Sequence, residues 1–419
     1  MQLFGLVNEL LAQHKNNAEV DVSRVDDLTL QRYAVVPLTE NIGVIGWVEG
    51  CDTLHSLVSG YRGPRHIPDM LELSLMQAAA PAKVPPENFN VVYHRLTCLQ
   101  KQEVFRFARD NTSGDDLAKS MWLSSSDSET WLDRRTLYTR SLALMSVVGY
   151  MLGLGDRHPS NIMLQRSTGK VVHIDFGDCW EVAQMRDLYP EKVPFRLTRM
   201  LVNAMEVGGI DGTFRSTCEL VLSVLRQNRS SVMAMLETFV YDPLINWRLL
   251  PEDGDKKNKS SRRRDNDDDD DDDDDDKGDE LPSNVAVGME SAIRIKNATK
   301  NFVGSVRKSI KTRRKSSLFL LSSIGPSVGG VNDNVDNNAG ASVKSERLTE
   351  SAENAIRRVE AKLHGRDFTG IMSKNNSNHE VKDNAASPMA VTDQIDFLIE
   401  QASSLENLSE AYIGWCPFW

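Results

Sequence analysis

Cysteine is scarce in this 419-residue sequence, and long apolar runs are absent. Five cysteines, at positions 51, 98, 179, 218 and 416, form no Cys-x-x-Cys pair and no regular ladder. This pattern excludes a disulfide-rich secreted scaffold and indicates thiols kept reduced in the cytosol or nucleus. No apolar run approaches the roughly 18 residues of a membrane-spanning helix, and no signal peptide opens the chain. We expect cytoplasmic residence, with nuclear and endomembrane-associated residence left open.

An excess of basic charge is also missing, although the formal net charge of −11 overstates the acidity of the folded part. Ten consecutive aspartates, Asp267–Asp276, supply most of that charge, and the chain is nearly neutral without them. A broad basic face for nucleic acid is therefore not expected. The hydrophobic content of 40% suits a globular core of one large domain or two.

Residues suited to chemistry concentrate in the stretch 154–178, which reads LGDRHPSNIMLQRSTGKVVHIDFGD. Its apolar runs predict two short strands, Ile162–Leu164 and Val171–Ile174, and the polar residues between them predict a turn at Ser167–Lys170. Asp156 and Asn161 then lie on the loop before the first strand, and Asp175 lies at the end of the second. We expect this hairpin to bring the two carboxylates and the amide to one mouth.

Two carboxylates and an amide in this order are typical of phosphoryl transfer. Asp and Asn oxygens hold Mg²⁺ against nucleotide phosphates, and a further Asp orients the attacking hydroxyl. Ordinary protein kinases use H-R-D-x-x-x-x-N followed by D-F-G. Asp156 and Asn161 keep that Asp-to-Asn spacing, but His158 follows the Asp instead of preceding it. The alternative is purely structural, with Asp156 capping a helix end and Asp175 in a turn.

The D-R-H-x-x-N order with D-F-G resembles the phosphatidylinositol-3-kinase-like superfamily. Within it, five stretches resemble the target-of-rapamycin family of large Ser/Thr protein kinases that control growth: Gly153–Met163, His173–Val182, Pro194–Met200, Phe239–Leu244 and Tyr412–Trp419. The resemblance covers residues 1–250 and 352–419. It implies an α+β, bilobal kinase-like fold with a mostly helical large lobe and a small lobe truncated at its N-terminus.

The resemblance also implies roles for the residues at the hairpin mouth. Asp156 orients and deprotonates the substrate hydroxyl, and His158 donates to the transferring phosphoryl group. Asn161 and Asp175 hold Mg²⁺, or alternatively Mn²⁺, between the phosphates of ATP. The adenine slot is implied at Tyr33, Trp47, Val48, Met163 and Ile174. Each of these five residues alone fits a core position of a β-hairpin or of the catalytic loop at least as well.

Composition and resemblance together divide the chain into five expected parts. They are the remainder of the small lobe with the hinge (1–48), the large lobe with its catalytic and activation loops (49–250), a disordered acidic and basic insertion (251–345), a helix with a linker (346–386) and the FATC segment (387–419). Met1–Leu30 contains no GxGxxG and no Lys on a buried strand. The kinase is therefore expected to begin upstream of Met1, and a product lacking that part of its ATP site is the alternative.

Apolar residues at helical spacing predict the main helices. They are expected at Met1–Gln13, His94–Asn111 continuing into Asp115–Leu123, Arg134–Leu154, Thr213–Gln227, Ser230–Tyr241, Leu348–Leu363 and Asp393–Leu405. A second hairpin is expected from Leu30–Leu38 and Gly43–Glu49. Gly153 and Gly155 can end the long helix before Asp156, and Thr392 can cap the last helix.

The resemblance implies partners as well. The insert around 64–123 is expected to dock a WD-repeat propeller subunit, and scaffold subunits of a large complex are implied beside protein substrates. Trp415, Phe418 and Trp419 either pack against the large lobe, which we prefer, or make a peripheral membrane contact. The basic stretch 281–325 suits a membrane-surface helix, a nuclear import signal, an arm folding onto the aspartate run, or no dedicated partner.

Two rival functions stay open at this point. A phosphoinositide kinase would share the chemistry, but the mixed charge of Phe176–Arg199 suits a protein substrate better than an inositol lipid. The FATC resemblance argues against that rival too. The second rival is a catalytically impaired chain that acts as an interaction module. The intact Asp156, Asn161 and Asp175 disfavour it, whereas the missing Lys strand favours it.

Overall fold

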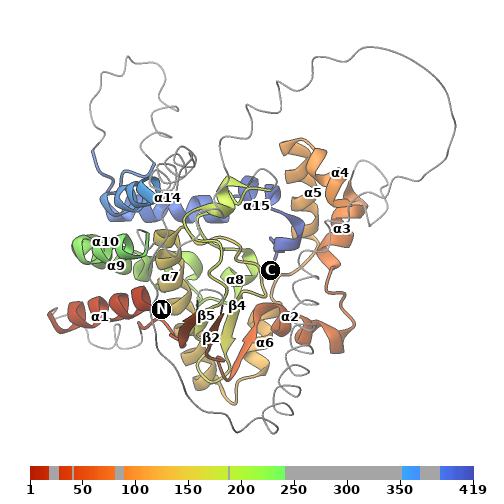
Figure 1. Cartoon of the computed structure of the whole chain (residues 1–419). Helices are drawn as coiled ribbons and strands as arrows, with labels where there is room; N and C mark the ends of the chain where they lie inside the picture. Colours follow the sequence, from red (N-terminus) through yellow and green to blue (C-terminus); the bar gives the residue numbers. More distant parts are fainter. Residues whose placement is uncertain (18–27, 40–41, 81–88, 187–188, 241–351, 369–386) are drawn as a thin grey trace, which may run out of the picture. The chain divides into compact units, whose positions relative to one another are not determined.

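The computed structural model describes residues 1–17, 28–39, 42–80, 89–186, 189–240, 352–368 and 387–419 (Figure 1). The helices are α1 (Gln2–Asn17), α2 (Leu54–Arg62), α3 (Leu71–Ala79), α4 (Phe89–Arg95), α5 (Cys98–Asp110), α6 (Asp116–Leu123), α7 (Ser128–Leu152), α8 (Arg199–Asn203), α9 (Thr213–Gln227), α10 (Arg229–Val240), α14 (Val391–Ser403) and α15 (Leu405–Glu410). The strands are β1 (Val35–Thr39), β2 (Ile42–Ile45), β3 (Cys51–Thr53), β4 (Ile162–Gln165) and β5 (Val171–His173). A further helix covers 352–364.

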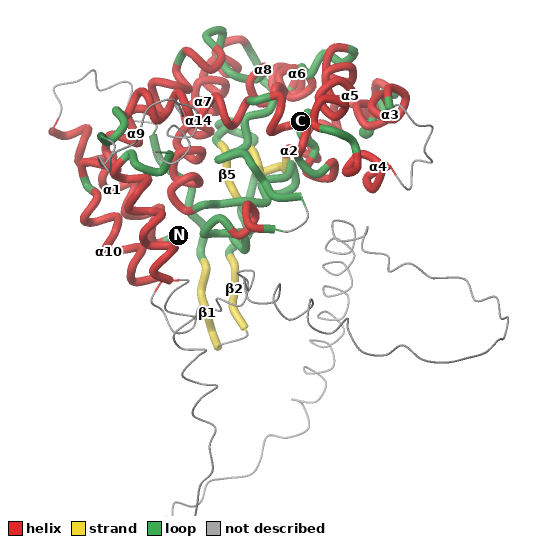
Figure 2. The backbone as a smooth tube through the Cα atoms, turned by 90° about the horizontal axis from the view of Figure 1, so that it is seen from above, coloured by secondary structure: helices red, strands yellow, loops and turns green. Residues whose placement is uncertain are grey.

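The strands of the described residues form two small antiparallel sheets among many helices (Figure 2). β1 and β2 form the hairpin expected from Leu30–Leu38 and Gly43–Glu49, with Val35 opposite Ile45, and every residue of both strands is exposed. β4 and β5 form the hairpin expected from Ile162–Leu164 and Val171–Ile174, in which Ile162 lies opposite His173. The sequence patterning missed β3, which pairs with the other edge of β4. The α+β class expected from the sequence is confirmed.

Helix α7 lies in the core and positions the catalytic loop. It begins at Ser128 rather than at Arg134, because the Asp127 carboxylate accepts a hydrogen bond from the Thr130 amide at 2.8 Å and caps the helix. Its buried face packs mainly against α9, whose bounds match the prediction. Gly153 ends the helix in the left-handed conformation, as its position in the sequence predicts.

The helices of the insert are more broken than the sequence indicated. The expected continuous helix over His94–Asn111 is wrong, because α4 ends at Arg95 and α5 begins after Thr97. The Thr97 hydroxyl accepts from the Gln100 amide at 3.3 Å, and the Gln100 side chain accepts from the Thr97 amide at 3.1 Å. This reciprocal capping box fixes the start of a new helix. α6 is a separate helix as well.

The closing residues of the chain pack against its catalytic part. Trp415, Phe418 and Trp419 are buried, and the Phe418 ring stacks on Phe105 of α5 with centroids 4.2 Å apart. Their burial confirms the packing interpretation. α14 begins after Ala390 with no side-chain cap, so the expected cap at Thr392 is wrong. Through the described ranges, no helix combines the length and apolar character needed to cross a membrane.

Several expectations fall outside the described residues. They include the whole insertion at 251–345, with its aspartate run and the basic stretch 281–325. Of the helix expected over Leu348–Leu363, the described part runs from 352 to 364, with Val359 and Leu363 buried.

Candidate active site

A tight turn delivers Asp156 from the end of α7. The Gly153 and Leu154 amides donate to the carbonyl oxygens of Tyr150 and Gly149 at 3.0 and 2.9 Å. This is a Schellman arrangement, and it requires the positive φ of 58° that Gly153 adopts. The start of the catalytic loop is therefore fixed by backbone hydrogen bonds to a buried helix.

The backbone of Asp156 is held on both sides by side chains. Its φ of 57° lies in the left-handed region, which residues with a side chain seldom adopt. The Asp156 amide donates to Glu191 Oε1 at 2.8 Å, and the Asp156 carbonyl oxygen accepts from Asn161 Nδ2 at 2.9 Å. These two hydrogen bonds use the backbone of Asp156 and leave its carboxylate for other contacts.

Arg157 joins the catalytic loop to the D-F-G segment. Its guanidinium group donates to the carbonyl oxygens of Gly155 and Ile174, each at 2.8 Å, and also to that of Asp175. The side chain is buried, and it lies over the Phe176 ring at 5.9 Å. One cation thus holds the two loops of the predicted mouth together, because it satisfies carbonyl oxygens on both.

Asn161 and Asp175 lie on adjoining backbone at that mouth. The Asn161 carbonyl oxygen accepts from the Ile174 amide at 3.1 Å, which places Asp175 next in the chain. Asp175 is exposed and has a φ of 58°, and its Oδ1 accepts a 3.2 Å hydrogen bond from the Gly177 amide.

This donor set fits a divalent cation shared with phosphates. The Asn161 amide nitrogen is engaged by Asp156, which leaves its oxygen for a hard cation beside the Asp175 carboxylate. Magnesium is commonly held by one or two protein oxygens together with substrate phosphates. Among the described residues, no group of three or more His, Cys, Asp or Glu side chains gathers as a self-sufficient metal site. The pair therefore fits a metal that arrives with a nucleotide.

His158 is neutral and has a defined tautomer. Its Nδ1 accepts a hydrogen bond from the Ser160 amide at 3.2 Å, so the ring proton resides on Nε2. Burial lowers the pKa of His158, while the Asp156 carboxylate opposes this shift and the Arg196 and Arg157 guanidinium groups reinforce it. The result is a neutral N–H donor next to the expected base.

The residues expected in the adenine slot differ in exposure. Met163 is buried in β4, whereas Val48 and Ile174 are partly exposed. Trp47, which follows β2, exposes 88% of its surface. Tyr33 is partly exposed, and burial raises the pKa of its hydroxyl, with Arg157 opposing and Asp175 reinforcing the shift. The structure thus places Met163 within the hairpin and Ile174 directly after it, and leaves Trp47 largely open.

Three residues of the site escaped the sequence reasoning. Arg157 stood inside the motif without a role, and Glu191 and Arg196 stood in the activation segment as part of its mixed charge. Arg196 donates to the carbonyl oxygens of Arg157 and Trp415 at 3.1 and 2.8 Å. The sequence did contain a signal for Glu191 and Arg196. They lie in P-E-K-V-P-F-R, whose last three residues belong to the stretch Pro194–Met200 that resembles the family. The partners of these residues are backbone atoms, which leave no mark in a sequence.

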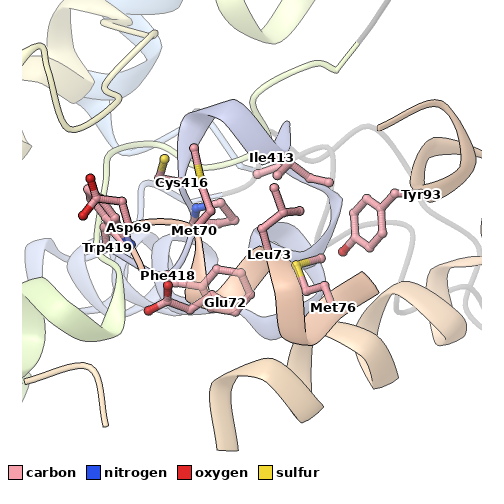
Figure 3. A pocket seen from close by; sticks show the side chains of 12 residues that line it. Asp69, Met70, Glu72, Leu73, Met76, Tyr93, Ile413, Cys416, Phe418 and Trp419 are labelled. Carbon is pink, nitrogen blue, oxygen red and sulfur yellow. The ribbon is translucent and has the colours of Figure 1, made fainter. Parts of the chain in front are cut away.

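A small cavity of about 30 Å³ lies between α3 and the closing residues (Figure 3). Leu73 and Met76 of α3 line one part of it, and Ile413, Cys416 and Phe418 line another. None of the catalytic residues named above borders this cavity. It belongs to the packing of the FATC segment and not to the candidate active site.

The comparisons with known proteins agree with this geometry. A model of the family described as phosphatidylinositol 3- and 4-kinase matches residues 1–249, and a model of the FATC domain matches residues 388–419. The helical body, the β4–β5 hairpin and the D-R-H-x-x-N and D-F-G loops define a protein of the kinase-fold class. The chain belongs to the phosphatidylinositol 3- and 4-kinase family.

Individual relatives narrow the resemblance to target-of-rapamycin kinases. Over its full length the chain is 44% identical to the serine/threonine-protein kinase mTor of Drosophila melanogaster and 43% identical to the serine/threonine-protein kinase TOR of Oryza sativa. It is 42% identical to the serine/threonine-protein kinase TOR2 of Saccharomyces cerevisiae. The chain spans 14%, 15% and 14% of the lengths of these relatives.

Solved structures share the fold. The open conformation of CtTel1 superposes on the whole chain with a TM-score of 0.59 and 24% identity, over 11% of that protein. The FAT and kinase domain of CtTel1 gives 0.58 and 22%, over 21% of its chain. The expected membership in the kinase family and the expected fold class are confirmed. Kinases of this family use ATP with a divalent metal.

Proposed function

We propose that this chain carries the phosphoryl-transfer site of a Ser/Thr protein kinase in target-of-rapamycin-type growth signalling. ATP is the donor, and Mg²⁺ is the metal, with Mn²⁺ as a substitute. The observation that carries the proposal is the bridge made by Arg157, which fastens the Asp156 loop to the Asp175 loop through the Gly155 and Ile174 carbonyl oxygens at 2.8 Å. Phosphoryl transfer depends on such positioning more than on covalent catalysis by the protein.

Each residue then has one task. The Asp156 carboxylate accepts the proton of a Ser or Thr hydroxyl as its oxygen bonds to the γ-phosphorus and the bond to the β-phosphate oxygen breaks, releasing ADP. His158 donates its Nε2–H to the transferring phosphoryl group. Asn161 and Asp175 supply oxygen ligands to the metal. The bound metal ion neutralises charge that develops on the phosphates.

A protein substrate is favoured over an inositol lipid by the state of the basic residues in the activation segment. In its described parts, 176–186 and 189–199, Arg186 pairs with Asp178 and Lys192 pairs with Glu410. Arg196 is buried against backbone carbonyl oxygens. These cations are engaged within the protein, so they do not form the open basic patch that a phosphorylated inositol headgroup requires.

The experiment compares two acceptors under identical Mg²⁺ and ATP concentrations. Transfer of labelled γ-phosphate is followed to a Ser/Thr peptide library and to phosphatidylinositol vesicles, with Asp156→Asn as the inactive control. We expect labelled peptide, unlabelled lipid and loss of both signals in the control. Labelled lipid without labelled peptide would overturn the protein-kinase assignment. A wild-type chain that labels neither acceptor would favour the interaction-module function.

We propose further that the insert docks a WD-repeat propeller subunit, within a complex that also contains scaffold subunits. Apolar side chains stand exposed on its helices, with Val91 at 49% on α4 and Leu99 at 72% and Phe107 at 45% on α5. Isolated exposed apolar side chains are common, but three on adjoining helices suit an interface. Co-purification with a recombinant propeller tests this, because Leu99→Glu should abolish it.

Cytoplasmic residence, with endomembrane or nuclear association as alternatives, is tested by imaging the tagged chain.

A further inference from the structure

The conformation of Asp156 poses a physical question. A positive φ is strained for a residue with a Cβ, and such a conformation persists only where the surroundings enforce it. Asp156 has a φ of 57°. Its carbonyl oxygen is fixed by Asn161 within the same loop. Its amide is fixed from a distant segment, by Glu191 Oε1 at 2.8 Å.

Glu191 is itself anchored in the activation segment. Its amide donates to the Ala183 carbonyl oxygen at 3.0 Å. The Ala183 side chain packs against Gly155 so closely that a Cβ built on Gly155 would lie 2.2 Å from the Ala183 Cβ. The Gly155 amide also donates to the Asp178 carbonyl oxygen at 2.8 Å. The activation segment is thus folded directly onto the turn that carries Asp156.

The surroundings of Glu191 set the pKa of the carboxyl group that accepts the hydrogen bond from the Asp156 amide. Burial raises the pKa of Glu191 to about 7, and the Asp156 carboxylate adds to the rise. The Asp156 amide, Arg186 and Arg157 oppose it. Both the ionised and the neutral carboxyl group can accept a hydrogen bond from an amide. The contact therefore persists across the neutral pH range.

We propose that Glu191 is a positioning residue that holds Asp156 in its catalytic conformation from the activation segment. The base is in place only when the segment is folded back onto Gly155. This makes the geometry of proton abstraction depend on the segment that also borders the substrate. The inference rests on the proposed function for its kinetic consequence, although the structural tie itself does not.

Kinetics provide the first test, with three variants of the full chain. Glu191→Leu removes the acceptor at similar size, Glu191→Gln keeps an acceptor oxygen, and Glu237→Gln alters an exposed carboxylate on α10 as the matched control. We expect Glu191→Leu to lower kcat for peptide phosphorylation about tenfold or more while KM for ATP changes less than about twofold. Glu191→Gln should restore kcat to within about threefold of wild type. Equal losses in the Leu and Gln variants would overturn the proposal.

Hydrogen exchange provides a second test that does not need activity. In Glu191→Leu, amides within 153–161 should exchange faster than in wild type, while those of the central part of α7 should not change. Glu191→Gln should retain protection. Unchanged exchange at 153–161 in Glu191→Leu would overturn the tie, whether or not the chain phosphorylates peptides. If Glu191→Leu exchanges faster at 153–161 but the wild-type chain transfers no phosphate, the proposed function is contradicted and the contact between Glu191 and Asp156 still stands.

Discussion

The guanidinium group of Arg196 donates to the main-chain oxygen of Trp419 at 2.6 Å and to the Arg157 carbonyl oxygen at 3.1 Å. Arg196 also donates to the Trp415 carbonyl oxygen at 2.8 Å, and its Cζ lies 4.2 Å from the centroid of the Trp415 ring. One buried cation thus connects the FATC segment with the catalytic loop. Residues that lie more than 200 positions apart in sequence share its hydrogen bonds.

Replacing Arg196 by Lys should destabilise the fold. An ammonium group cannot reproduce the planar fork, so several buried carbonyl oxygens would lose their donor. We expect a loss of about 3 kcal/mol in the free energy of unfolding, since each unsatisfied buried acceptor costs about 1–3 kcal/mol. Denaturant unfolding measures it, with the exposed Arg65→Lys as control. Equal midpoints for the two variants would contradict the bridging role.

Glu191 should make stability depend on pH in a defined direction. Its pKa is about 7 in the folded chain against an ordinary 4.5, so folding takes up a proton between these values. The stabilisation is complete below about pH 4.5 and is lost as pH rises through about 7. Glu191→Gln removes this ionisation. It should therefore be more stable than wild type at pH 8, by roughly 1–3 kcal/mol, and equal to it at pH 4.5.

Thermal denaturation at the two pH values measures this difference. The control is Glu237→Gln, which should show no pH-dependent advantage. An advantage of Glu191→Gln that is the same at pH 4.5 and pH 8 would show that the carboxyl group does not titrate as its surroundings predict.

Trp47 offers a test of the expected adenine slot that is separate from folding. With 88% of its surface exposed, it contributes little to the core. Trp47→Ala should leave the unfolding midpoint unchanged, because surface substitutions usually shift stability by less than about 0.5 kcal/mol. If the ring stacks on adenine, the variant should weaken ATP binding by about tenfold, as loss of a stacking aromatic does. Unchanged affinity, measured by calorimetry, would remove Trp47 from the slot.

Local sequence signals predicted the hairpin and the grouping at its mouth. Asp156 and Asn161 lie on the loop just before β4 and Asp175 lies just after β5, so pairing of these two strands brings the two loops together through short-range backbone structure. The left-handed end of α7 was readable from Gly153 for the same reason. The capping box at Thr97 was also local, and its T-x-x-Q pattern could have revealed the break between α4 and α5.

Long-range contacts could not be predicted in this way. Glu191 meets Asp156 across 35 positions, and Arg196 meets Trp419 across 223. Both contacts end on backbone atoms, which every residue possesses, so no residue type marks the partner. The boundary of α7 at Ser128 shows a milder form of the problem, because a polar first turn conceals a helix whose apolar spacing starts later.

The most direct test of the account separates nucleotide binding from phosphoryl transfer. Wild type, Asp156→Asn and Asp175→Asn are compared for Mg²⁺-dependent ATP affinity and for labelling of a Ser/Thr peptide; Asn is chosen because it tolerates the positive φ found at both positions. We predict that Asp156→Asn keeps ATP affinity and loses transfer by about 10²–10⁴-fold, whereas Asp175→Asn loses the Mg²⁺-dependent affinity itself. Transfer at the wild-type rate by Asp156→Asn, or unchanged Mg²⁺ dependence in Asp175→Asn, would contradict the account.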